Sequence, residues 1–337
     1  TNLTFAWLTS PANPYLKWEV VRMINYGLDF SLFNRRISGS FEYFNKKASD
    51  LISNDPVDPT TGFNAVNSNV AEIRGRGFDF QLNGIISRGP FSWTSTVSLS
   101  HVRDIVSKYF GTELTTANYV TPGGKTFNPR EGKGFYGIYS YRFVGLDPND
   151  GSPIGRVNGE PSKDYTMIIR DSIDKQTYHG SGLPPYEGFW RNTMNWKGLN
   201  LSFSLAFKFG SFFRKETISY SSLYSTWQSH GDFSRRWQKP GDEKTTTVPS
   251  MAYPVVANRD AFYMYSEANI FRSDILRFQD IRMGYALNAL NNKVKVNVFL
   301  TAQNLGLIWR ANKASIDPDY PTLPRPTNYS LGIKADF

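Results

Sequence analysis

Cysteine is absent from the 337 residues, so the chain can hold no disulfide, no zinc–thiolate site and no cysteine nucleophile. It also lacks any run of about 18 apolar residues, which excludes a transmembrane helix. A membrane β-barrel stays open, because alternation dilutes the apolar residues of its strands. The histidines, His101, His179 and His230, stand in unrelated segments without metal-ligand spacing, and no nucleophile elbow or phosphate-binding loop occurs. We therefore expect no metal, no cofactor and no enzymatic activity.

The first twenty residues lack a basic segment followed by an apolar core, so no secretory signal is expected there. Such a chain is either cytosolic or the rear part of a longer protein, and the strand count below favours the second. The net charge is +9. Lys and Arg are scattered rather than clustered, which favours a solvated or lumen-facing distribution and argues against nucleic-acid binding.

Aromatic residues are abundant: 25 Phe, 19 Tyr and 8 Trp make up 15% of the chain. Apolar and polar residues alternate along much of the sequence. In 199–209, LNLSFSLAFKF, Leu or Phe takes every second position. Because side chains of a strand point alternately to its two faces, this period predicts strands with one apolar and one polar face. Nine spanning strands are predicted, at 20–33, 37–47, 72–87, 90–105, 188–196, 199–209, 272–287, 294–304 and 328–337.

The connections between these strands fall into two classes. Short turns are predicted near residues 35, 88, 198 and 290, and long loops at 47–71, 106–187, 210–271 and 305–327. Short turns at one end and long loops at the other are typical of outer-membrane barrels. The extended segment 134–147 would break the up–down order if it spanned the membrane, so we place it among the extracellular loops.

Nine strands do not close a bacterial barrel, which has an even number of strands, and an open edge in lipid leaves backbone groups unpaired. The remaining strands are therefore expected to come from elsewhere. One alternative is a soluble or surface-attached β-sandwich, a carbohydrate-binding or adhesin protein, in which the apolar faces pack on each other. Another is a β-rich glycosidase, which is disfavoured because no carboxylate pair stands out.

The order of several motifs resembles the C-terminal part of the barrel in SusC/RagA-type TonB-dependent transporters of Bacteroidetes outer membranes. The resemblance spans nearly the whole chain. It rests on NPYLKWEVVRMINYGLDFSLFNRRISGSFEYFNKKASDLI (13–52), EIRGRGFDFQLNG (72–84), YGIYSYRFVGLDPNDGSPI (136–154), WKGLNLSFSLAFKFG (196–210), ILRFQDIRMGYALN (275–288), FLTAQNLGLIW (299–309) and DPDYPTLPRPTNYSLGIKADF (317–337).

This resemblance implies an all-β fold, the C-terminal portion of a 22-stranded antiparallel transmembrane β-barrel with a plugged lumen. Residues 1–337 would form a single domain, and the plug and N-terminal strands would precede it. The implied function is outer-membrane nutrient uptake. The implied partners are the N-terminal plug and barrel segment, TonB acting through that segment, a SusD-like lid lipoprotein, outer-membrane lipid, and an oligosaccharide or oligopeptide cargo. A dimer of transporter–lid pairs is a plausible assembly.

Candidate binding residues lie in the aromatic-rich segment 210–271, where aromatic rings can stack on sugars or on peptide side chains. The candidates are Trp227, Arg235, Arg236, Trp237, Tyr263 and Tyr265. The same side chains would equally serve to pack the loop or to lie beneath the lid protein. In the final strand, the resemblance implies a barrel-assembly signal formed by Tyr329, Leu331, Ile333 and Phe337.

Overall fold

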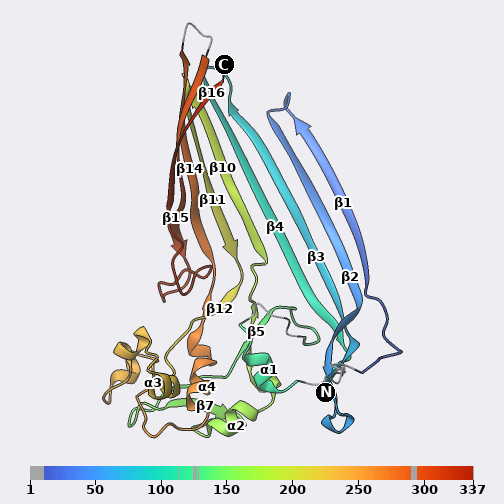
Figure 1. Ribbon diagram of the computed structural model, residues 1–337, viewed down its shortest axis with the longest axis vertical. Coiled ribbons are helices and arrows are strands. Elements are labelled where there is room, and N and C mark those ends of the chain that lie inside the picture. Colours follow the sequence, from blue (N-terminus) through green and yellow to red (C-terminus); the bar gives the residue numbers. More distant parts are fainter. Residues whose placement is uncertain (1–10, 113, 124–126, 128, 290–293, 337) are drawn as a thin grey trace, which may run out of the picture.

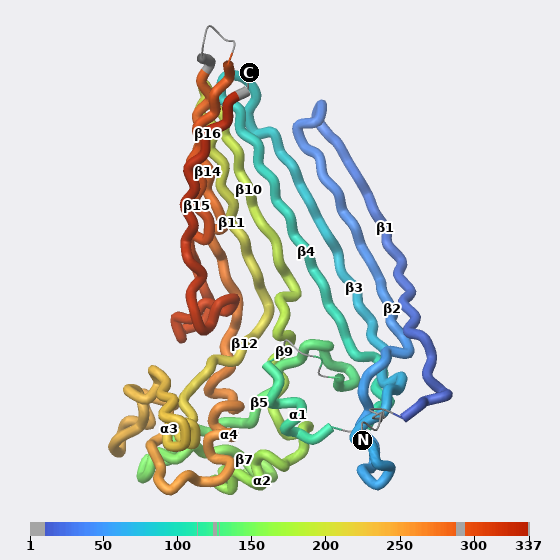
Figure 2. The backbone as a smooth tube through the Cα atoms, viewed as in Figure 1, coloured from blue at the N-terminus to red at the C-terminus, as the bar shows by residue number. Residues whose placement is uncertain are grey.

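The computed structural model describes residues 11–336, apart from 113, 124–126, 128 and 290–293. Within these residues, nine strands form one antiparallel sheet in which every strand pairs with its neighbours in sequence order. The strands are β1 (Val20–Leu32), β2 (Ile37–Pro56), β3 (Ala65–Ser87), β4 (Phe91–Tyr109), β10 (Tyr186–Trp196), β11 (Leu199–Phe209), β14 (Ile275–Ala289), β15 (Val294–Arg310) and β16 (Asn328–Asp336). β1 and β16 are the edges of this sheet, and Figure 2 shows them on opposite sides of the molecule. The nine predicted spanning strands are thus confirmed.

One face of the sheet is apolar because the register brings the apolar positions of adjacent strands opposite each other. One such row crosses β1 to β4 and contains Leu28, Phe41, Phe80 and Leu99. Another crosses β10 to β16 and contains Met194, Leu201, Met283, Leu300 and Leu331. Leu331 is 74% exposed. Within the described residues the other sheets have only two or three strands, so no second large sheet covers this face, and the β-sandwich alternative was wrong.

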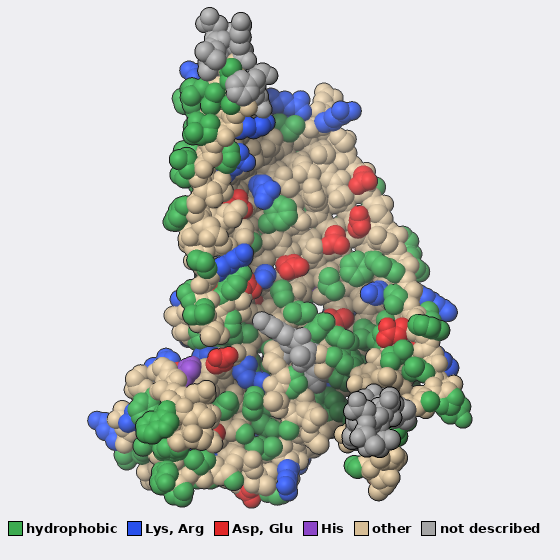
Figure 3. All heavy atoms as spheres, in the orientation of Figure 1, with side chains coloured by type: hydrophobic (Ala, Val, Ile, Leu, Met, Phe, Trp, Pro, Cys, Tyr) green, Lys and Arg blue, Asp and Glu red, His purple; other side chains and the backbone are tan. Residues whose placement is uncertain are grey.

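The opposite face is polar. A row across β2, β3, β4, β10 and β11 reads Glu42, Asp79, Ser100, Glu187 and Lys208. Figure 3 shows acidic and basic side chains scattered over one face of the sheet, while hydrophobic side chains gather along its left margin. This division matches a wall with lipid on one side and a watery or protein-filled lumen on the other.

The two ends of the sheet differ as the connection lengths predict. The hairpin connections 33–36, 88–90 and 197–198 lie at one end (the top of Figure 1), and the helices and small sheets lie at the other. The fourth short turn, predicted near residue 290, lies outside the described residues. Lys197 and Gly198 both have positive φ, 46° and 87°, which lets two residues reverse the chain between β10 and β11.

The predicted long loop at 47–71 was wrong. β2 and β3 stay paired as far as Pro56 and Ala65, and only the connection 57–64 separates them, with the 3-10 turn η1 (Pro59–Thr61) inside it. Register shifts beside Leu51 interrupt the alternation of apolar and polar residues there. The alternation therefore did not predict this part of the hairpin. β15 likewise continues beyond residue 304, which shortens the last predicted loop to 311–327.

The other two long connections, 110–185 and 210–274, fold together into what we call the loop unit. Its strands are β5 (Gly137–Ser140), β6 (Gly145–Leu146), β7 (Pro153–Val157), β8 (Glu160–Ser162), β9 (Thr177–Ser181), β12 (Phe212–Arg214) and β13 (Ile270–Arg272). Its helices are α1 (Thr116–Val120), α2 (Tyr165–Arg170), α3 (Tyr220–Thr226) and α4 (Arg259–Met264), with 3-10 turns η2 (Ile173–Lys175), η3 (Gly231–Arg235), η4 (Asp242–Lys244) and η5 (Glu267–Asn269). None of the helices described is long and apolar enough to span a membrane.

The loop unit has a hydrophobic core of its own, which joins both connections. Its buried members are Tyr119, Val120, Tyr139, Tyr141, Tyr165, Ile168, Ile173 and Phe262. A smaller cluster consists of Ile218, Tyr220 and Val248. β5 and β6 belong to small sheets outside the nine-stranded sheet, which confirms the placement of segment 134–147 among the loops.

Candidate functional site

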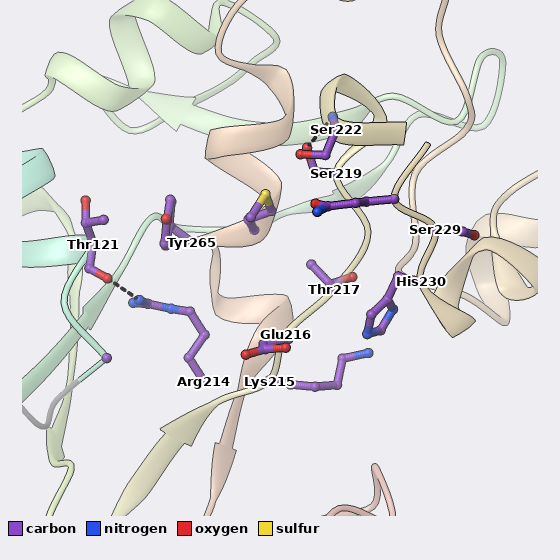
Figure 4. Close-up of a pocket in the computed structure, with 13 residues that line it drawn as sticks. Thr121, Arg214, Lys215, Glu216, Thr217, Ser219, Ser222, Ser229, His230 and Tyr265 are labelled. Carbon is purple, nitrogen blue, oxygen red and sulfur yellow. Dashed lines mark hydrogen bonds between the residues drawn. The ribbon is translucent and has the colours of Figure 1, made fainter. Parts of the chain in front are cut away.

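A cavity of about 530 Å³ lies in the loop unit. It forms where the chain after α1, the segment from β12 into α3 and the C-terminal end of α4 meet (Figure 4). The lining residues are Thr121, Gly123, Arg214, Lys215, Glu216, Thr217, Ser219, Ser222, Gln228, Ser229, His230, Met264 and Tyr265. Most of these residues carry a hydroxyl, amide or charged group among the apolar atoms of the lining, so the cavity can hold a ligand that has polar groups.

Arg214, the last residue of β12, is the central cation of the cavity wall. Its guanidinium donates hydrogen bonds to three backbone carbonyls, those of Thr121 at 3.0 Å, Val120 at 2.7 Å and Tyr139 at 2.7 Å. It also lies 5.0 Å from the ring centroid of Tyr265. Burial lowers the pKa of Arg214 to about 10, partly opposed by Tyr265, so the group remains cationic at neutral pH.

Lys215 and Asp232 form a neutralised pair beside Arg214. The Lys215 Nζ lies 2.6 Å from an Asp232 carboxylate oxygen, and Thr217 donates to the same oxygen at 2.8 Å. Arg235 binds the other oxygen. Burial alone would raise the pKa of Asp232, but the hydrogen bonds from Lys215, Thr217 and Arg235 outweigh it and hold this pKa below its usual range. Asp232 is therefore ionised at neutral pH and shares its single negative charge between Lys215 and Arg235.

Glu216 differs from its neighbours because its side chain is exposed and enters no hydrogen bond or ion pair within the described part of the chain. Figure 4 shows Arg214, Lys215 and Glu216 following one another along one wall, with Ser219 and Ser222 on another. The cavity therefore presents one cation bound only to carbonyls, one paired cation, one unpaired carboxylate and several hydroxyls. Such a lining can hold a polar, charged ligand by hydrogen bonds and charge.

Of the six predicted binding residues, the structure brings Tyr265 to this cavity. Trp227 lies at the C-terminal cap of α3 and is 88% exposed. Tyr263 is 2% exposed and Trp237 is 8% exposed, so both are interior residues of the loop unit. Substrate contact by these residues stays a prediction.

The two predicted arginines make contacts within their own turn. Arg235 pairs with Asp232, three residues earlier. Arg236 stacks 4.0 Å from the ring centroid of Phe233 and donates to its carbonyl at 3.0 Å. Sequence reasoning missed Arg214, because a single Arg after an alternating strand carries no motif. Its role depends on contacts with segments about 75 and 94 positions away in the chain.

One side-chain pair has the composition of a nucleophile and its base. Ser140 Oγ lies 2.7 Å from His179 Nε2, and burial lowers the pKa of His179, opposed by Glu267. Ser140, however, has 0% exposure. No substrate can reach that hydroxyl, so the pair joins β5 to β9 in the interior.

The predicted assembly signal lies on the last strand. Tyr329, Leu331 and Ile333 are exposed on the apolar face of β16, opposite Ala302, Leu300 and Val298 of β15. Phe337 lies outside the described residues. The role of these residues in assembly stays a prediction.

Comparison with known proteins connects this architecture to one class. The family described as "TonB dependent receptor-like, beta-barrel" matches residues 2–143. TonB-dependent receptor P39 of Formosa agariphila is 23% identical over 96% of this chain and 36% of the relative. TonB-dependent receptor SusC of Bacteroides thetaiotaomicron is 25% identical over 96% of this chain and 32% of the relative. The chain thus spans about a third of the length of the curated relatives it matches.

Solved structures show the same fold. The RagAB peptide transporter aligns with a TM-score of 0.70 and 22% identity over 96% of this chain and 36% of that chain. The RagAB peptide importer in the open-open state aligns with a TM-score of 0.72 and 22% identity over 98% and 36%. Together with the nine-stranded sheet, these findings show that the chain has the fold of part of the RagA barrel and that its residues 2–143 are similar to the β-barrel of TonB-dependent receptors. The relatives P39 and SusC are both named TonB-dependent receptors.

Proposed function

We propose that this chain supplies barrel wall and extracellular loops to a SusC-like transporter in the outer membrane of a Gram-negative bacterium. The observation that carries the proposal is the single sheet. Its strands pair in chain order, one face is apolar and exposed, and hairpin turns and folded loops occupy opposite ends. The edge strands β1 and β16 need partners in a membrane, because unpaired backbone groups cost several kcal/mol each in lipid. The remaining strands and a lumen plug come from the rest of the protein.

The cargo of this transporter is an oligopeptide or an oligosaccharide, taken up with energy delivered through TonB. A SusD-like lipoprotein covers the loop end. Large apolar side chains exposed on the loop unit support such a partner, since Trp227 is 88% and Tyr253 80% exposed. Exposed apolar groups of this size are typical of interaction surfaces.

The proposal is tested on the full-length protein with an affinity tag, extracted from the outer membrane in detergent. Mass spectrometry of the intact complex is expected to show a single polypeptide about three times longer than this chain, with a lipoprotein bound, because the chain spans about 36% of its relatives. The same spectrum reports whether two such pairs associate.

Uptake is measured in a strain that lacks the gene, with labelled oligopeptides and oligosaccharides as alternative cargoes. Loss of uptake of one class, restored by the gene on a plasmid, is the expected result. A protein that fractionates with the soluble extract, or a deletion strain with unchanged uptake of both classes, would contradict the proposal.

A further inference from the structure

We propose that the cavity around Arg214 binds a carboxylate group of the transported molecule. This inference rests on the proposed function and adds the chemical class that the loop unit selects. A peptide C-terminus and a uronic-acid sugar both carry that group, and the two sources are separated by the experiment below.

Arg214 lacks a carboxylate counter-charge in the described structure. Lys215, the next residue, pairs with Asp232 at 2.6 Å, whereas the buried Arg259 of α4 is bonded to Ser250 and, like Arg214, has no carboxylate partner in the described structure; Arg259 does not line the cavity. All three hydrogen bonds of Arg214 end on carbonyl oxygens. Carbonyl dipoles orient the guanidinium without cancelling its charge, so a net positive charge faces the cavity.

The guanidinium of Arg214 has donors that its three hydrogen bonds do not use. Nε of Arg214 is buried and has no hydrogen-bond partner in the described structure. Nη1 uses only one of its two hydrogens, in the bond to Thr121. Arg is the side chain whose planar donors match a carboxylate best, and a bond between two charged groups is stronger than one between neutral groups. A carboxylate oxygen at the Nη1 side of Arg214 would accept the remaining Nη1 hydrogen.

An acidic group, an aromatic ring and hydroxyls also line the cavity. Glu216 lies in the same wall, is exposed, and has no ion-pair partner within the described residues. Its charge opposes an incoming anion, so it limits affinity and disfavours ligands with several adjacent negative charges. The ring of Tyr265, stacked on Arg214 at 5.0 Å, and the hydroxyls of Ser222 and Ser229 are suited to the uncharged remainder of the ligand.

The test uses the full-length transporter with its lipoprotein partner in detergent and isothermal titration calorimetry. Four probes are compared: an Ala/Ser oligopeptide with a free C-terminal carboxylate, the same peptide as its C-terminal amide, an oligogalacturonide, and the neutral oligogalactoside of equal length. One acidic probe is expected to bind about tenfold or more tightly than its neutral counterpart, as the loss of a charge-assisted hydrogen bond predicts. The pair that shows the difference identifies the source of the carboxylate.

Three variants locate that preference. Arg214→Gln should reduce it to within about twofold, the size expected once the charge is gone. Glu216→Gln should increase it, and this variant breaks no described contact, so it remains informative if Arg214→Gln fails to fold. Arg170→Gln is the matched control, because Arg170 is exposed in the last turn of α2 and does not line the cavity; it should leave the preference unchanged.

The outcomes are distinguishable. Equal binding of acidic and neutral probes, or a preference that Glu216→Gln leaves unaltered, overturns the carboxylate site while the transporter proposal stands. Failure of all four probes to bind overturns both the site and the proposed cargo classes.

Discussion

Arg277 of β14 forms an ion pair with Asp317, which lies in the connection between β15 and β16. Nη2 of Arg277 lies 2.7 Å from both carboxylate oxygens of Asp317. Nη2 also reaches Asp319 at 3.2 Å, and Lys208 of β11 approaches Asp319 at 2.8 Å. These contacts hold the segment 311–327 against the polar face of the sheet. The Arg277 side chain is only 8% exposed, so water screens the pair weakly.

Replacement of Arg277 by Gln should release this segment. Two carboxylates would lose their shared donor in a poorly hydrated place, at a cost of about 1–3 kcal/mol. Limited trypsin digestion of the full-length protein in detergent measures the effect, with faster cleavage expected after Lys313, the cleavable basic residue of this segment, since Arg325 precedes a proline. Asp317→Asn should act in the same direction. Glu160→Gln, at an exposed residue of β8, serves as the control, and a digestion rate for Arg277→Gln equal to that of the control would refute the tether.

The two faces of β3 should respond oppositely to the same substitution. Phe80 belongs to the apolar row with Phe41 and Leu99, and the next residue, Gln81, faces Ser40 and Ser98 on the polar side. Phe80→Arg should destabilise the barrel by about 2–4 kcal/mol if the position lies near the middle of the membrane, and Gln81→Arg should have little effect. Urea unfolding of the full-length protein in lipid vesicles measures both. Equal stability of the two variants would argue against a lipid-facing apolar side.

Two glycines of the RGRG stretch should differ although they are two residues apart. A Cβ at Gly77 would lie 2.6 Å from the ring of Phe44, its cross-strand partner, and closer still to the carbonyl oxygen of His101. A Cβ at Gly75 would meet nothing within 4 Å. Gly77→Ala should therefore cost about 1–3 kcal/mol through forced displacement of the ring and strand. Gly75→Ala should leave heat-induced unfolding of the purified protein unchanged. If Gly77→Ala also left heat-induced unfolding unchanged, the strands would have to shift apart at little cost.

Acid should loosen the loop unit around Asp232. The pKa of Asp232 is lower in the folded protein than its ordinary value of 3.8, so its stabilising effect is complete above that value and is lost as the pH falls through the folded pKa. Trp237 fluorescence, isolated by replacing other Trp residues, should change as the pH falls below about 4, near the ordinary carboxyl value. Asp232→Asn should already be loosened at neutral pH and should show no such step. A step of full size in Asp232→Asn would assign the transition to another group.

The spanning strands were predictable because their signal is local. Each strand turns every second side chain to the same face. A sheet with lipid on one side and water on the other therefore requires alternating apolar and polar residues, as in segment 199–209. The prediction failed between residues 47 and 71, where register shifts beside Leu51 break the period while the backbone pairing continues. The prediction also treated residues 106–187 and 210–271 as plain loops and did not include their folding into the loop unit. The core residues Tyr139 and Phe262 pack together from positions more than a hundred residues apart, and no local period records such a contact.

The sequence by itself determined the class of fold: alternation and turn spacing specify an antiparallel sheet with one apolar and one polar face, because these features act between near neighbours in the chain. Only the tertiary structure decided the candidate site. Arg214 has no carboxylate partner in the described structure because folding brings the carbonyls of Val120 and Tyr139 to its guanidinium. The nearby carboxylate of Asp232 pairs with Lys215 instead. The same residues in an unfolded chain would be ordinary solvated charges. Burial and the choice of partner, which depend on distant segments, give Arg214 its capacity to hold an anion.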